Sequence, residues 1–131
     1  MIGRSNHVFI KALALEHLCA NIDIIVFVKT IDGEFIQVSN SYTKHFTAEE
    51  PLDFLNKVLW DEECLKEWTE NDQRVFKTKK THIFEERVPT IIGEPISESN
   101  PAKWFLVKKI PLINEADEVV GLTAIATELW T

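Results

Sequence analysis

The sequence contains little glycine and cysteine, with 4 Gly and 2 Cys among 131 residues. It has no Gly-rich phosphate loop, no dinucleotide fingerprint and no Gly-x-Ser-x-Gly nucleophile motif. Cys19 and Cys64 lack the C-x-x-C spacing and follow no secretory leader, which indicates reduced thiols in a cytoplasmic protein. These absences give no support for an enzyme.

Long apolar runs and an excess of positive charge are also missing. The most apolar stretch, Val8 to Val28, is interrupted by Lys11, Glu16 and Asp23 before about 18 apolar residues accumulate, so we expect no membrane insertion. The formal net charge is −7 and the pI is about 5.1. Nucleic-acid binding relies on clustered Lys and Arg, so we expect no direct contact with nucleic acid.

The composition is that of one soluble globular domain, with 45% hydrophobic and 27% charged residues. Residues 1–21 predict an N-terminal amphipathic helix, and 22–131 predict the folded domain. A helical stripe formed by Val8, Ala12, Leu15 and Cys19 requires a partner surface. This surface is either the chain's own sheet or a second copy of the helix, so the stripe is a candidate dimer interface.

The remaining elements follow from periodicity and turn residues. Asp32-Gly33 separates two strand-like segments, which predicts a hairpin. Ser39 and Asn40 can cap a short helix that ends near Thr47. The other expected elements are a helix at Glu63–Lys79 and strands at His82–Val88, Lys103–Ile110 and Val119–Leu129. This order predicts an α+β domain with a five-stranded antiparallel sheet and helices on one face.

Several local motifs appear in the order found in a known family. Val26-Phe27-Val28-Lys29 followed by Asp32-Gly33 resembles the opening hairpin of PAS domains, in particular the PAS fold-4 subgroup. Further along the chain, Trp68, Asp72 and Val75 resemble the family's helix pattern. The later strands match at Trp104, Lys108-Lys109, Pro111-Leu112 and Val120-Gly121-Leu122. The resemblance covers roughly Ile22 to Leu129.

The chain departs from the family pattern at three places. Ser39 and Thr47 replace the usual Asn and Gly around the first core helix, and Lys79 stands where Gly is common. Glu128-Leu129-Trp130 takes the place of the Asp-Ile-Thr that often leads into an effector. The last departure leaves the form of output coupling open.

The resemblance implies a signal-sensing input domain that binds a small molecule or a partner and performs no catalysis. By family analogy we expect a homodimer, and an effector domain C-terminal to this chain in a longer protein: a kinase, a diguanylate cyclase or a DNA-binding regulator. Met1 has the character of a native start, which favours this direction. One alternative is a ligand-free dimerisation module of the same fold. A second is a small α+β enzyme of the cone-shaped class.

We expect no haem, flavin or metal. A haem-binding PAS domain has an axial His on its pocket helix, and Glu63–Lys79 contains none. A flavin photosensor has a reactive Cys in an Asn-Cys-Arg-Phe-Leu-Gln-like motif, whereas Cys64 lies in Glu-Glu-Cys-Leu-Lys. The spacing of the four histidines matches no metal-site pattern.

A candidate ligand pocket follows from strand alternation and helical spacing. Glu86 shares a strand face with Phe84 and Val88, whereas Glu85 and Arg87 point to the other face. If its face points inward, Glu86 requires a partner or a ligand. The predicted lining residues are Phe27, Tyr42, Phe46, Phe84, Glu86, Leu106 and Thr123.

Overall fold

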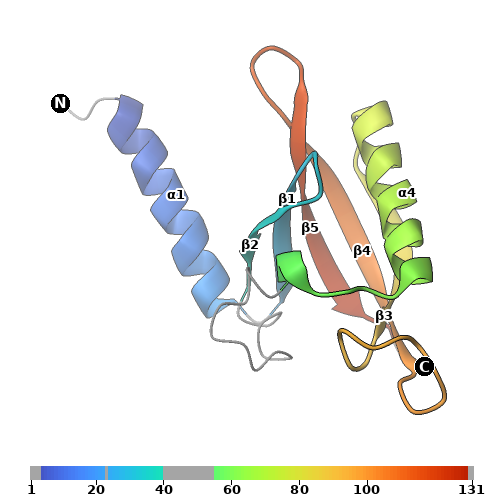
Figure 1. The fold of residues 1–131 in the computed structure, drawn as a ribbon. Coiled ribbons are helices and arrows are strands. Elements are labelled where there is room, and N and C mark those ends of the chain that lie inside the picture. The colour runs from blue at the N-terminus through green and yellow to red at the C-terminus, as the bar shows by residue number, and fades with distance from the viewer. Residues whose placement is uncertain (1–3, 23, 40–54, 130–131) are drawn as a thin grey trace.

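The computed structural model describes residues 4–22, 24–39 and 55–129. The elements are α1 (Arg4–Asn21), β1 (Ile25–Thr30), β2 (Phe35–Val38), α4 (Glu62–Thr78), β3 (His82–Pro89), β4 (Ala102–Ile113) and β5 (Val119–Glu128). The five strands form one antiparallel sheet in the order β2-β1-β5-β4-β3 (Figure 1). The predicted fold class is confirmed. The helix predicted before Thr47 lies outside the described residues.

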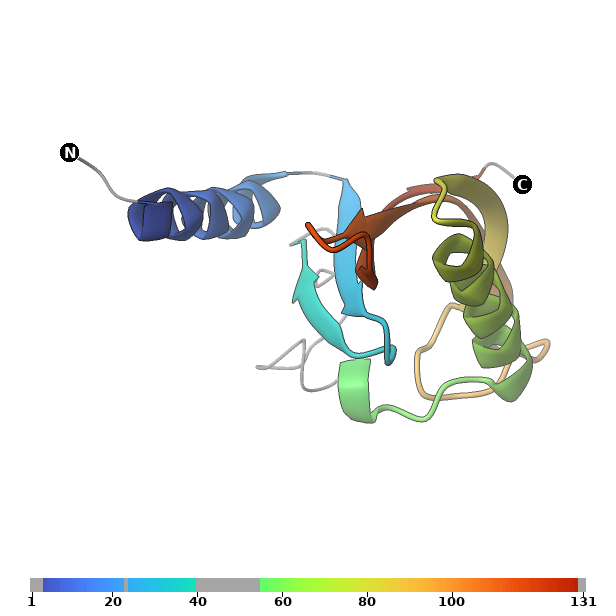
Figure 2. The same ribbon diagram turned by 90° about the horizontal axis from the view of Figure 1, so that it is seen from above.

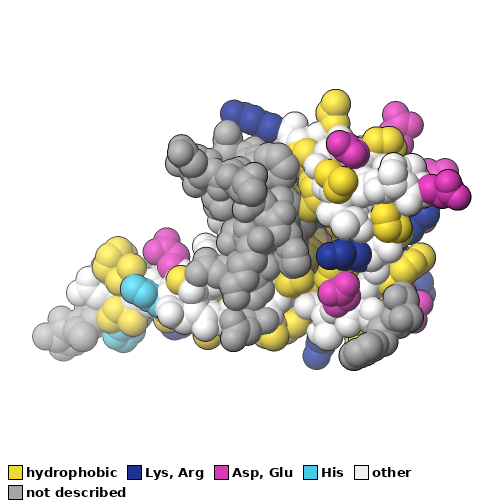
Figure 3. Space-filling view, turned by 90° about the horizontal axis from the view of Figure 1, so that it is seen from below, with side chains coloured by type: hydrophobic (Ala, Val, Ile, Leu, Met, Phe, Trp, Pro, Cys, Tyr) yellow, Lys and Arg dark blue, Asp and Glu magenta, His cyan; other side chains and the backbone are white. Residues whose placement is uncertain are grey.

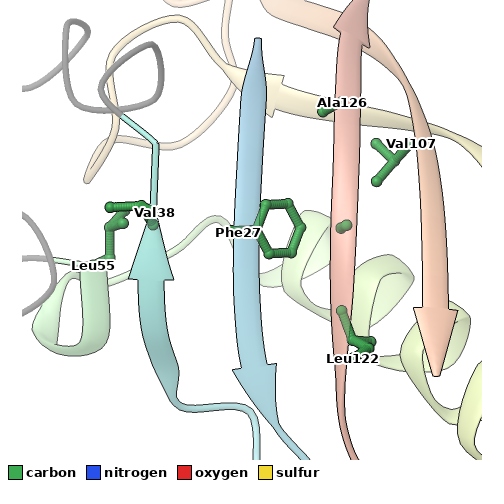
Figure 4. Close-up of a cluster of buried hydrophobic side chains, with 7 residues drawn as sticks. Phe27, Val38, Leu55, Val107, Leu122 and Ala126 are labelled. Carbon is green, nitrogen blue, oxygen red and sulfur yellow. The ribbon is translucent and has the colours of Figure 1, made fainter. Parts of the chain in front are cut away.

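The curved sheet holds its core on the face toward α4 (Figure 2). Side chains alternate along each strand, so every second residue of β1, β4 and β5 points to this inner face. The resulting apolar cluster is shown in Figure 4 and comprises Phe27, Val38, Leu55, Val107, Leu122, Ala124 and Ala126. The helix α4 contacts β3, β4 and β5 and completes the inner layer.

Both ends of α4 are capped. Asp61 accepts a hydrogen bond at Oδ2 from the Cys64 amide (3.1 Å), which satisfies a free amide of the first turn. Lys79 ends the helix in the left-handed conformation, with φ of 53°, and its amide donates to Val75 O. Glycine adopts this conformation most easily. Lys79 therefore occupies a backbone position that favours Gly.

Side chains form hydrogen bonds with the backbone of the edge strand β2 and of its neighbour β1. Asn56 accepts from the Phe35 amide (2.8 Å) and donates to the Phe35 carbonyl (3.0 Å), as a neighbouring strand would. Ser39 is fully buried, and its hydroxyl accepts from the Val26 amide and donates to the Ile24 carbonyl. The prediction of Ser39 as a helix cap is therefore wrong, because its side chain secures β2 to β1 instead.

Gly121 permits the close pairing of β5 with β1. A Cβ atom at this position would lie 2.3 Å from the carbonyl oxygen of Lys29, which is backbone and cannot turn away. Gly121 pairs with Thr30 in the sheet register. The glycine of the Val120-Gly121-Leu122 motif is therefore required by strand packing.

The helix α1 projects from the rest of the molecule, and its hydrophobic side chains are visible in Figure 3. Its contacts with the sheet are made with β2. Cys19, near its C-terminal end, is buried, whereas Val8 and Leu15 are 67% and 40% exposed. Only one end of the predicted stripe thus packs on the chain's own sheet. Among the described helices, none has the length and apolar character needed to cross a membrane.

Candidate ligand-binding cavity

A cavity of about 90 Å³ lies between the inner face of the sheet, α4 and the loop that follows β3. Its walls are mostly aliphatic and aromatic: Ile25, Phe27, Phe35, Trp68, Val88, Pro89, Ile92, Phe105, Val107 and Ala126. Its polar lining comes from Lys29, Glu86, Thr90, Lys103 and Lys109. An apolar chamber with a few converging polar groups is the usual form of a small-molecule site.

Four charged side chains meet at the inner end of the cavity, and we refer to Lys29, Asp72, Glu86 and Lys109 as the charged cluster. The Lys109 ammonium lies 2.6 Å from Asp72 Oδ1 and 2.6 Å from Glu86 Oε2. The Lys29 ammonium lies 3.1 Å from Asp72 Oδ2. The Lys109 side chain is 1% exposed and the Glu86 side chain 6%. The cluster thus joins α4 to β1, β3 and β4 at a buried point.

The charges within the cluster balance, with two ammonium groups against two carboxylates. A buried charge without a partner carries a desolvation penalty of several kcal/mol, so this pairing allows the four groups to remain inside. Asn71 adds a hydrogen bond from its amide nitrogen to Glu86 Oε2 (2.9 Å). The cluster is therefore stable in its present composition and sensitive to the loss of any one member.

Two members of the cluster keep hydrogen-bonding capacity toward the cavity. Lys29 has three N–H groups, and its one hydrogen bond within the described chain goes to Asp72. Its ammonium also lies 4.9 Å from the centre of the Phe35 ring. Glu86 accepts both of its contacts at Oε2. No fully buried side-chain oxygen of the described residues lacks a partner, so Glu86 Oε1 keeps some accessible surface, and Glu86 lines the cavity.

The loop after β3 forms a fixed wall at the other end of the cavity, where it contributes Thr90 and Ile92. Asn100 is buried and holds this loop, because its amide nitrogen donates to the carbonyls of Ile91, Glu94 and Pro95. Its Oδ1 accepts from the Ile91 amide. The loop is thus held in place without a disulfide.

Asp61 connects this loop to the start of α4. Its Oδ1 accepts from the Ile96 amide (3.2 Å), while Oδ2 caps the helix. The hydrogen bonds from the backbone amides of Cys64 and Ile96 lower the pKa of the Asp61 carboxyl. One ionised side chain therefore positions both the helix and the wall of the cavity.

The predicted inward positions agree with the structure in part. Phe27 and Glu86 line the cavity. Phe84 lies on the same strand face as Glu86, with its ring centre 5.7 Å from the Lys109 ammonium, but it is not part of the lining. Tyr42 and Phe46 lie outside the described residues. A role in ligand binding stays a prediction for all of these residues.

The inward orientation predicted for Leu106 and Thr123 is wrong. Leu106 is 40% exposed, because its neighbours Phe105 and Val107 occupy the inner face of β4. Thr123 lies between the buried Leu122 and Ala124, and its hydroxyl donates to Phe27 O (3.2 Å) across the β1–β5 pairing. Because side chains alternate every residue, a shift of one position reverses the face.

The sequence interpretation missed the cations of the cluster. In the sequence, Asp72 and the Lys108-Lys109 pair were assigned only as family motifs. Lys29 was assigned only as part of the opening hairpin. One available signal was that Asp72 falls between Trp68 and Val75 at helical spacing, on a face that is otherwise apolar. A carboxylate at such a position requires a buried cation.

Similarity to known proteins is found in comparisons of structure and not in comparisons of sequence. No family model matches the sequence, and no curated protein matches it. A PAS domain from Colwellia psychrerythraea superposes with a TM-score of 0.62 at 12% identity, covering 93% of this chain and 96% of the other. The PAS domain of a two-component sensor histidine kinase gives 0.63 at 15% identity, with coverage of 93% and 99%. The chain has the PAS fold.

A third PAS-fold relative is VqmA of Vibrio cholerae, solved as a dimer, with a TM-score of 0.67 at 13% identity. The match covers 90% of this chain and 51% of VqmA, so this chain corresponds to about half of that protein. Another structure in this group is described as VqmA bound to DPO. At these identities the likeness establishes the PAS fold and leaves the fold-4 subgroup undecided.

Proposed function

We propose that this chain is a sensory input domain that binds a small molecule in the cavity between α4 and the sheet. The observation that carries the proposal is the apolar chamber that ends at Lys29 and Glu86, both with hydrogen-bonding capacity directed into it. A chamber that served only for packing would not require two charged groups with unfilled hydrogen-bonding capacity at its end. The domain performs no covalent chemistry of its own.

Two proteins of the same fold support this function by analogy. One relative is part of a two-component sensor histidine kinase, and another is a regulator solved with DPO bound. In this chain, ligand binding would act through a shift in conformational population, because a ligand favours the state to which it binds more tightly. The charged cluster connects the cavity to α4 through Asp72. The relay would run to an effector domain, and we place the protein in the cytoplasm.

Native mass spectrometry of the purified chain tests this proposal. The protein should carry a small molecule at a stoichiometric level, and Ala126→Leu should lose it because the larger side chain fills the cavity that Ala126 lines. Thr127→Leu places the same side chain on the exposed neighbouring position of β5 and should retain the ligand. Equal ligand contents in Ala126→Leu and Thr127→Leu would contradict binding in this cavity. An empty wild-type protein would favour the ligand-free module.

We also propose a homodimer formed through α1. Val8 and Leu15 share one stripe of this helix and are 67% and 40% exposed. A cluster of exposed apolar side chains on a projecting helix indicates an interaction surface. The dimeric state of VqmA makes a second copy of the chain the natural partner.

A further inference from the structure

We propose that the ligand is a small uncharged molecule with an apolar body and, at one end, both a hydrogen-bond donor and an acceptor. An amide, a lactam or a hydroxy ketone has this chemistry. The inference rests on the proposed function, since it defines what the cavity selects. Three properties of the site lead to it: the charge balance of the cluster, the two open hydrogen-bonding groups and the size of the chamber.

The charge balance excludes ionised ligands from the inner end. A carboxylate placed there would meet Asp72 and Glu86 as well as Lys29 and Lys109, so the net electrostatic gain is small. Its desolvation penalty would remain several kcal/mol. The same argument applies to an ammonium ion. A neutral polar group avoids this penalty and still forms hydrogen bonds.

The open groups specify the two atoms that the ligand must present. Lys29 offers N–H donors and therefore selects an acceptor, while Glu86 Oε1 offers lone pairs and therefore selects a donor. Lys29 contacts Asp72, and Glu86 contacts Lys109, which is the other partner of Asp72, so both groups belong to one network. A ligand that satisfies both carries a donor and an acceptor at the end that faces the cluster.

The chamber limits the remainder of the ligand to a few apolar atoms. An apolar protein cavity of about 150 Å³ holds one benzene molecule, so a chamber of about 90 Å³ suits a ring of five or six atoms at most. Phe27, Phe35 and Phe105 provide apolar walls for such a body. The size of the chamber therefore favours such small molecules over lipids and nucleotides.

Lys103 does not alter this selection. It lines the cavity from the other end of β4, six residues from Lys109, which corresponds to roughly 20 Å along an extended strand. It is only partly buried, so its charge is compensated by water. Among the residues that the structure describes, the neutral environment of the inner end is therefore set by the cluster.

Titration with five-membered rings, followed by the amide signals of the ¹⁵N-labelled chain, tests the inference. We expect 2-pyrrolidinone, which presents an N–H beside a carbonyl, to shift the cavity amides with millimolar affinity, as is usual for so few atoms. Cyclopentanone lacks the donor and should bind about tenfold more weakly, since a hydrogen bond to a charged group contributes about 1.5 kcal/mol. Cyclopentanecarboxylate and pyrrolidinium should not shift these signals.

Two variants with matched controls test the charge argument. Glu86→Gln gives the cluster one excess positive charge, and it should then bind cyclopentanecarboxylate in preference to 2-pyrrolidinone. Lys29→Met gives one excess negative charge and should admit pyrrolidinium. Glu85→Gln and Lys108→Met make the same changes at exposed positions on the outer face and should behave as wild type.

The outcomes separate this inference from the proposed function. If wild-type protein binds cyclopentanecarboxylate in the cavity more tightly than 2-pyrrolidinone, the ligand class is wrong and the sensory function stands. If neither variant changes the charge preference, the cluster does not select the ligand. If no probe shifts any cavity amide, and the purified chain also carries no molecule, the inference and the proposed function both fail.

Discussion

The helices α1 and α4 differ in how completely their ends and side chains are paired with other parts of the same chain. The helix α4 has caps at both ends, three buried side chains and an ion-pair connection to three strands through Asp72 and Arg87. The helix α1 contacts β2 at one end and exposes apolar side chains along most of its length. The helix α4 therefore belongs to the core, whereas α1 requires a further surface.

This difference indicates that the two helices have different roles. Under the proposed sensory function, the helix beside the cavity would respond to a ligand, and the projecting helix would contact a surface outside the domain. Asp72 on α4 lies one side chain away from the cavity, while the stripe on α1 begins at Cys19 and extends away from the sheet. The following predictions compare the two helices.

The largest effect is expected at Asp72. Asp72→Ala leaves Lys29 without its carboxylate and Lys109 with one of two, so it should lower the free energy of unfolding by about 3–5 kcal/mol. Urea denaturation measures this change. Glu70→Ala, at an exposed position of the same helix, should alter it by about 0.5 kcal/mol or less. A similar loss in both variants would show that the cluster does not anchor α4.

The two cysteines compare the helices directly, since each helix carries one. Burial raises the pKa of Cys64 to about 12, and it also raises the pKa of Cys19. A pKa of about 12 leaves roughly a thousandth of the thiolate found in an ordinary cysteine. We expect iodoacetamide to modify Cys19 at least about tenfold faster, because local release of α1 exposes it.

Peptide mass spectrometry after timed alkylation distinguishes the two sites. Cys64 should react only at the rate of global unfolding. Addition of denaturant above the unfolding midpoint should remove the difference, which serves as the internal control. Equal rates in the native protein would mean that α1 is anchored as firmly as α4.

A substitution on α1 should change assembly and leave the core intact. Leu15→Glu should raise the dimer dissociation constant roughly tenfold to a hundredfold, because a buried Leu contributes about 1.5–3 kcal/mol. Sedimentation equilibrium measures this constant. His17→Glu places the same charge on the opposite side of the helix and should leave the dimer unchanged. A monomeric wild-type chain would refute the dimer proposal.

The smallest effect concerns acid sensitivity at the start of α4. Because the folded pKa of Asp61 lies below its ordinary value of 3.8, its carboxylate stabilises the fold above that value. This contribution is lost as the pH falls through the lower folded pKa. Asp61→Asn should therefore flatten the acid limb of stability against pH, whereas Asp32→Asn in the exposed hairpin turn should not. An unchanged acid limb in Asp61→Asn would contradict the assigned role.

Much of the fold could be predicted from local patterns. The strand β5 alternates between Leu122, Ala124 and Ala126 on one side and Thr123 and Ile125 on the other. Small apolar residues at every second position identify the inner face. The same pattern, applied consistently, would have excluded Thr123 from the lining.

The face of β4 could not be predicted in the same way. Trp104, Leu106 and Lys108 occupy one face, while Phe105, Val107 and Lys109 occupy the other, so both faces have the same character in sequence. The choice depends on Asp72, which lies 37 residues from Lys109 in the chain. A contact of this range has no local signature, and the prediction of Leu106 failed for that reason.

The most direct test of the sensory account is amide hydrogen exchange of the chain as purified, compared with the same chain unfolded, dialysed and refolded. The account predicts that the stripped protein exchanges faster in α4 and around Val88, Phe105 and Val107, where the cavity loses its occupant, while α1 remains unchanged. Identical exchange in both samples throughout the described elements would contradict it, because the cavity would then have held no ligand.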